Sequence, residues 1–254
     1  MKYGIRDGML RLPFEQTFAE ARRLGFDGIE ICLGGNYREH KLWSEEGIAE
    51  IQKISADANI EVPSLSPGGF TSYTFAHPDE SKREEGKAML KYLIETCPKI
   101  GAYAILVPFF GSGKINPEDI TSPIFIGGIK EVAKVAETHK VYLALESTLS
   151  ASDHLRILEQ VKSPYVKVYY DIGNATGFGF NAAEEIKQLS SEIVVIHVKD
   201  TGGHLGEGKV NFSAVSEAIR KIKYDGYLVL ETPSGNDASA SAARNLAFSK
   251  KIFG

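Results

Sequence analysis

Short runs of β-branched and aromatic residues alternate along the whole chain with longer stretches of helical periodicity. The apolar runs predict eight strands, at residues 2–6, 28–32, 60–66, 104–110, 141–146, 166–171, 193–200 and 226–231. Between the strands, apolar residues recur every three or four positions, as at Phe14, Phe18, Ala21 and Leu24. This spacing gives an α-helix one apolar stripe. The pattern therefore predicts eight strands that alternate with eight helical stretches.

The residues at the ends of the helical stretches support this assignment. Ser44 is followed by Glu45 and Glu46, which is typical of a helix start with an N-cap hydroxyl and acidic residues at the positive end of the helix. Gly25 and Gly101 each follow a helical stretch and are candidate C-caps.

Strict alternation of strands and helices predicts a parallel sheet whose strands are joined by helical crossovers. The chain has 254 residues, close to the usual size of one α/β barrel, and no linker or low-complexity tract divides it. We therefore expect a single (β/α)8 TIM-barrel domain that covers residues 1–254. A doubly wound open sheet is the alternative.

The last four predicted strands all finish in a residue that can bind a metal or carry a proton. The apolar run VYLAL leads to Glu146, VKVYY to Asp171, IVVI to His197 and GYLVL to Glu231. Because only 33 Asp and Glu and 6 His occur in 254 residues, four such matches by chance are rare. Active sites of α/β barrels form at the carboxyl ends of the strands. Four neighbouring strands would thus direct three carboxylates and one imidazole to a common point.

A bound metal ion would offset the negative charges of these three carboxylates. Three carboxylates cannot share a half-buried position without a cation, because repulsion and desolvation would protonate some of them. Three hard oxygen donors and one imidazole suit Mn²⁺, Co²⁺ or Mg²⁺, and Zn²⁺ is also compatible. We expect one divalent ion, most simply Mn²⁺, bound by Glu146, Asp171, His197 and Glu231.

These motifs resemble those of the xylose isomerase-like barrel superfamily of sugar isomerases and epimerases. The nearest resemblance is to the L-xylulose-5-phosphate (L-ribulose-5-phosphate) 3-epimerases, and it covers essentially the whole chain. It is carried by YYDIGNATGFG, IHVKDT, GEGKVNF, LVLET and LGFDGIEI. The resemblance implies that the four residues bind one divalent ion and that Glu146 and Glu231 form the acid/base pair.

The expected reaction is epimerisation at C3 of a ketose or ketose phosphate through an enediolate. A metal that holds the carbonyl and the adjacent hydroxyl acidifies the neighbouring C–H. One glutamate removes this proton and the other returns a proton to the opposite face. If protons were transferred on only one face of the sugar, the outcome would be aldose–ketose isomerisation.

Several further residues are expected to contact the substrate. Lys199 should point to the same side of its strand as His197. The others lie at strand ends or in the following loops: Glu30, Ser66, Phe109, Asn174 and His204. The alternatives are an ion pair for Glu30 and Lys199, and packing at the rim of the barrel for Phe109. Asn174 stands where epimerases of unphosphorylated ketoses carry a substrate-contacting histidine. The segment GGHL is shorter than in the phosphate epimerases, which puts recognition of a phosphate in doubt. Asp200 is expected to be structural, and His154 to be a surface or loop residue.

Composition limits the other function classes. A net charge of −4 and the absence of a Lys/Arg cluster argue against a nucleic-acid partner. No apolar stretch is long enough for a membrane span, Arg6 and Asp7 interrupt any signal-peptide core, and two cysteines make no disulfide framework. We expect a cytoplasmic enzyme with a small sugar substrate, and a homodimer or homotetramer is possible. The rival functions are a keto-sugar or inosose dehydratase, an apurinic-site endonuclease, and a non-catalytic sugar-binding barrel.

Overall fold

The computed structural model, which describes residues 1–254, contains eight parallel strands that close into a barrel. Each strand pairs with the next along the chain, and the eighth pairs with the first. This confirms the expected barrel and excludes an open sheet. The strands are β1 (Lys2–Arg6), β2 (Gly28–Leu33), β3 (Ser64–Pro67), β4 (Ala104–Phe109), β5 (Tyr142–Ser147), β6 (Val166–Asp171), β7 (Ile193–Val198) and β8 (Tyr227–Leu230).

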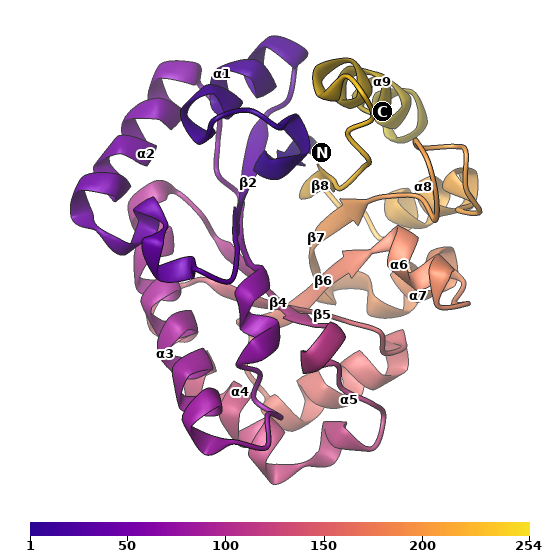
Figure 1. Ribbon diagram of the computed structural model, residues 1–254. Coiled ribbons are helices and arrows are strands. Elements are labelled where there is room, and N and C mark those ends of the chain that lie inside the picture. Colours follow the sequence, from indigo (N-terminus) through magenta and orange to yellow (C-terminus); the bar gives the residue numbers. More distant parts are fainter.

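The α-helices form a ring around the strands (Figure 1). They are α1 (Phe14–Leu24), α2 (Glu45–Ala58), α3 (Glu80–Thr96), α4 (Pro123–His139), α5 (Ala151–Val161), α6 (Ile172–Gly177), α7 (Ala182–Leu189), α8 (Phe212–Lys221) and α9 (Ala238–Phe253). None of these helices combines the length and the apolar character that a membrane crossing requires.

Two elements differ from the expectation. The third strand begins at Ser64 rather than at residue 60, because Pro63 has no N–H to donate to a ladder, although Glu61 still makes one isolated bridge to Gly28. There are nine α-helices rather than eight. The sixth crossover holds two, since the Asp171 side chain caps α6 and Asn181 caps α7.

The predicted helix ends lie where the capping residues indicate. The Ser44 hydroxyl accepts a hydrogen bond from the Gly47 N–H at 3.0 Å and starts α2. Gly25 ends α1 with φ of 94°, a left-handed conformation that glycine adopts without steric cost. Both predictions are confirmed.

The apolar core lies in two layers on either side of the strands. A cluster of 66 buried residues fills the space between the barrel and the helices, and a cluster of seven fills the inside of the barrel. Along β4, Ala104 and Leu106 belong to the inner cluster, whereas Ile105 and Val107 belong to the outer one. Because side chains alternate along a strand, this parity decides which residue at each strand end points into the barrel.

Candidate active site

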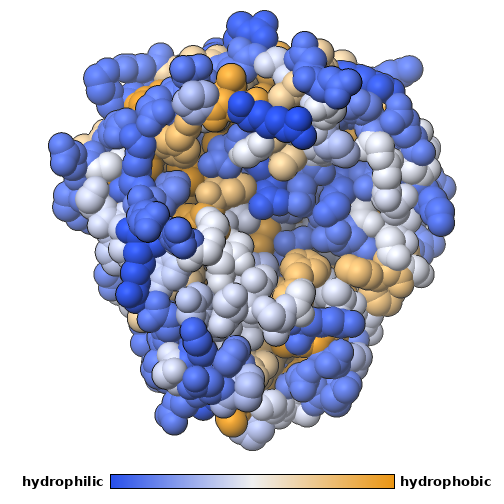
Figure 2. Space-filling model, in the orientation of Figure 1, coloured by the Kyte–Doolittle hydropathy of each residue, from blue (hydrophilic) through white to orange (hydrophobic).

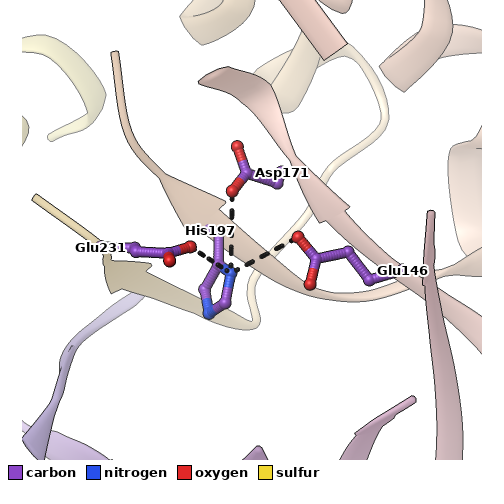
Figure 3. Close-up of side chains that lie close together, drawn as sticks. All are labelled: Glu146, Asp171, His197 and Glu231. Carbon is purple, nitrogen blue, oxygen red and sulfur yellow. Dashed lines mark ion pairs between the residues drawn. The ribbon is translucent and has the colours of Figure 1, made fainter. Parts of the chain in front are cut away.

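Four side chains from neighbouring strands meet at one point inside the barrel. Glu146, Asp171 and His197 lie on β5, β6 and β7, and Glu231 directly follows β8 (Figure 3). One ligand atom from each lies within 4.8 Å of the others. The Nδ1 atom of His197 lies 3.3 Å from a Glu231 oxygen, 3.8 Å from an Asp171 oxygen and 3.9 Å from a Glu146 oxygen. The convergence expected from the strand ends is therefore present.

Strand parity explains why these four residues point inward. Each stands two positions after a member of the inner core cluster, the four members being Ala144, Tyr169, Val195 and Val229. Residues two apart on a strand share one face. The inner apolar cluster is thus the floor of the site, and the polar residues form the next layer towards the carboxyl ends of the strands. Figure 2, in the same orientation as Figure 1, shows hydrophilic residues around a hollow at the centre of the ring of helices.

Asp171 is a buried carboxylate whose pKa is strongly perturbed. Burial raises its pKa to about 7, the charges of Glu146 and Glu231 add to this rise, and Lys199 and His197 oppose it. The Asp171 Oδ2 and His197 Nδ1 atoms are buried and have no hydrogen-bond partner. Two facing polar atoms without partners are costly in a protein interior. A divalent cation between them would satisfy both, so the donor set fits one such ion.

Arg6 is a member of the site that the sequence analysis missed. Its guanidinium forms an ion pair with Glu231 and lies 3.3 Å from Glu30 and 3.4 Å from the Ser66 hydroxyl. Arg6 ends the first predicted strand, just as Glu146, Asp171 and Glu231 end theirs. This shared position at a strand end could have identified Arg6 from the sequence.

Glu30 is buried and lies close to Arg6 and His197, which agrees with the alternative of an ion pair inside the barrel. Its side chain is 0% exposed. One oxygen lies 3.1 Å from His197 Nε2, and the other accepts hydrogen bonds from the Tyr169 hydroxyl at 2.5 Å and the Ser64 hydroxyl at 2.8 Å. Glu30 therefore lies beneath the imidazole, on the side opposite the three carboxylates.

Asn174 and Lys199 both contact the cluster. The Asn174 side-chain amide donates to Glu146 at 3.1 Å, and the Lys199 ammonium lies 3.5 Å from both Asp171 and Glu231. Gly173 is required beside Lys199, because a Cβ there would lie 2.9 Å from the Lys199 carbonyl oxygen. Both side chains therefore lie beside the cluster, and their contact with a substrate remains a prediction.

Phe109 and His204 lie away from the cluster of Glu146, Asp171, His197 and Glu231. Phe109 is fully buried on the outer face of β4, where its ring packs against Phe70 and Phe125. Parity turns it towards the helices, so the expected contact with substrate is wrong. The His204 ring contacts Asn245 on α9 at 3.2 Å rather than any of the four site residues, and its substrate contact remains a prediction.

His154 is buried rather than superficial, contrary to expectation. One ring nitrogen lies 3.1 Å from the Ser147 hydroxyl and the other 3.0 Å from the Ser150 carbonyl oxygen. Because Ser147 directly follows Glu146, the contact between His154 and Ser147 stabilises the end of β5.

Asp200 has the expected structural role. Its carboxylate accepts hydrogen bonds from the backbone N–H groups of four residues of the seventh loop, namely Thr201, Gly206, Gly208 and Val210. A Cβ at Gly208 would lie 2.1 Å from an Asp200 oxygen, which explains the glycine. The loop is thereby wrapped around one side chain.

Comparison with known proteins places this barrel in a family. The family described as "Xylose isomerase-like TIM barrel" matches residues 18–252. The L-ribulose-5-phosphate 3-epimerase UlaE of Salmonella paratyphi A is 27% identical over 242 residues, which are 89% of this chain and 85% of that protein. Among solved structures, a D-psicose 3-epimerase with D-fructose has a TM-score of 0.84 at 20% identity and covers 100% of both chains. An L-ribulose 3-epimerase also has a TM-score of 0.84, at 18% identity, over 99% of this chain and 94% of that chain.

These relatives are named epimerases, which are isomerases, as the sequence motifs predict. The structural likeness, at 20% identity and below, shows the shared fold. The family match extends over nearly the entire sequence. The chain belongs to the xylose isomerase-like TIM-barrel family.

Proposed function

We propose that the protein is a metal-dependent epimerase that acts at C3 of a ketose or ketose phosphate. The observation that carries this proposal is the placement of Glu146 and Glu231 on the two flanks of a donor set that includes Asp171 and His197. The relatives are named as 3-epimerases of L-ribulose 5-phosphate, D-psicose and L-ribulose. These names support the same reaction class.

Glu146, Asp171, His197 and Glu231 would hold the metal, which we propose to be Mn²⁺, with Co²⁺, Mg²⁺ and Zn²⁺ as alternatives. When bound, a divalent ion stabilises the negative charge that develops on the sugar oxygens during proton removal. The two unpartnered buried atoms of Asp171 and His197 are the structural support for this assignment.

The two glutamates carry the proton transfers. Each is oriented by a neighbour: the Asn174 amide donates to Glu146, and Arg6 forms an ion pair with Glu231. One carboxylate removes the C3 proton, and the other delivers a proton to the opposite face of the same carbon, which inverts the centre. Lys199 lies beside both Asp171 and Glu231 and is positioned to bind a substrate oxygen.

The test follows hydrogen exchange at C3. The Mn²⁺-loaded protein is incubated in D₂O with ketoses, ketose phosphates and inososes, and the products are analysed by NMR. We expect deuterium at C3 together with the inverted sugar. Glu146→Gln and Glu231→Gln should each abolish inversion, and the variant that retains the base should still exchange C3 hydrogen without inversion.

Glu61→Gln is the control variant, because Glu61 lies at the opposite end of the barrel, bonded to Lys2 and Tyr227. It should keep full activity. Loss of water instead of inversion would assign a dehydratase. Absence of exchange with every sugar, in protein that binds Mn²⁺, would overturn the epimerase proposal and leave a sugar-binding or hydrolytic role.

A further inference from the structure

Glu30 forms a completely buried anchor behind the candidate metal ligand His197. It lies on β2 and reaches across the inside of the barrel to β7, where its Oε1 atom lies 3.1 Å from His197 Nε2. The imidazole has a second nitrogen, Nδ1, which faces the three carboxylates. The two ring nitrogens thus have different partners on opposite sides of the ring.

We propose that Glu30 is a positioning residue that keeps a hydrogen on Nε2 of His197 and so leaves the lone pair of Nδ1 available to the metal. A carboxylate accepts hydrogen bonds, and a ring nitrogen that carries hydrogen cannot ligate a metal. A carboxylate behind a metal-bound histidine fixes both the tautomer and the orientation of the ring. This inference rests on the proposed metal centre.

Glu30 is itself held rigidly in place. Tyr169 and Ser64 donate to its second oxygen, and the Arg6 Nε lies 3.3 Å from the first. The Tyr169 ring also packs against the imidazole, with the ring centroids 4.4 Å apart. Because both oxygens are occupied and the side chain is 0% exposed, Glu30 cannot touch a substrate, and His197 is the candidate metal ligand that it contacts.

The adjacent residue on β6 provides a matched control. Tyr169 points into the barrel and bonds Glu30, whereas Tyr170 points outward and its hydroxyl donates to the buried Glu185 at 2.9 Å. Each pair joins a tyrosine hydroxyl to a buried carboxylate. Only the inner pair touches a candidate metal ligand. Glu185→Leu therefore removes a comparable buried carboxylate without affecting His197.

The experiment measures Zn²⁺ and Mn²⁺ affinity by competition with a chelator, and the His197 ring signals of the diamagnetic Zn²⁺-loaded protein by ¹⁵N NMR. For the wild type we expect Nδ1 as the ligand and a hydrogen-bonded, slowly exchanging Nε2–H. Glu30→Leu should weaken metal binding by roughly 10- to 100-fold and abolish the protected Nε2–H signal. Glu30→Gln retains an acceptor oxygen, so it should keep the signal and lose less affinity.

The outcomes separate this inference from the proposed function. If Glu30→Leu binds Zn²⁺ within about twofold of the wild type, as we expect for Glu185→Leu, the positioning role is wrong while the metal centre stands. If Glu30→Leu fails to fold, an unchanged affinity of Glu30→Gln together with an altered Nε2–H signal would equally overturn the role. A wild type that binds neither ion overturns the metal centre itself.

Discussion

Arg6 and Glu231 form an ion pair across the seam between β1 and β8, although 225 positions separate them in the chain. Burial acts to raise the pKa of Glu231, but His197, Arg6 and Lys199 together hold it well below its usual value. Arg6→Met removes one of these cations, so the pKa of Glu231 should rise. We expect the acid limb of the pH profile of kcat/KM to move to higher pH, and Arg6→Lys to move it less. A higher KM with an unmoved acid limb would show instead that Arg6 serves only substrate binding.

Metal binding should stabilise the fold. A ligand that binds only the folded state at 100 times its Kd adds about 2.7 kcal/mol. For a chain of this size that corresponds to a rise in Tm of roughly 5–10 °C. We expect differential scanning calorimetry to detect this rise when Mn²⁺ is added to protein treated with a chelator. Asp171→Asn should remove most of the rise, and Glu61→Gln should retain it. An equal rise in the Asp171→Asn protein would place the ion elsewhere.

Metal affinity should increase with pH. Without metal, burial raises the pKa of Asp171 to about 7. Burial alone would lower the pKa of His197, but the surrounding carboxylates, Glu30 foremost, raise it well above its usual value. Below pH 7 protons therefore occupy both ligands and compete with the metal. We expect the apparent Kd to fall as pH rises from 5.5 to 8, by up to about tenfold per pH unit for each proton displaced. Calorimetry in two buffers of different ionisation enthalpy should detect the release of at least one proton, and a pH-independent Kd would contradict this account.

His154 should make the fold sensitive to mild acid. Burial lowers its pKa from 6.5 to about 4, and its hydrogen bond to Ser150 only partly offsets this shift. Between pH 6.5 and 4 the unfolded chain binds a proton that the folded protein excludes, so the free energy of unfolding decreases as pH falls. The contribution lost is at most about 3 kcal/mol. His154→Gln lacks the titrating group, so urea unfolding should show wild type and variant converging in stability towards pH 4. Parallel stability curves would mean that His154 takes up its proton at the same pH in the folded protein as in the unfolded chain.

The barrel and the four converging side chains could both be predicted from the order of residues along the chain. Apolar runs that end in Glu146, Asp171, His197 and Glu231 are a local property of the chain. In a parallel barrel all strands end at the same rim, and consecutive strands usually pair, so residues at the ends of consecutive strands are expected to lie close together. This is why eight strands and the candidate site could be predicted without any contact being known.

How deeply a side chain is buried, which way it points and what it contacts depend on the tertiary fold. Phe109 lies near the end of β4 as Glu146 does on β5, but it pairs with Ser147, one residue beyond Glu146, and therefore faces outward. Which residues pair in this way is set by the register of the strands. Glu30 lies below the rim rather than on it, because Tyr169 and His197 reach it across the barrel. Arg6 meets Glu231 only because the barrel closes. Closure and register arise from pairing between distant segments, and no local pattern of residues encodes those distances.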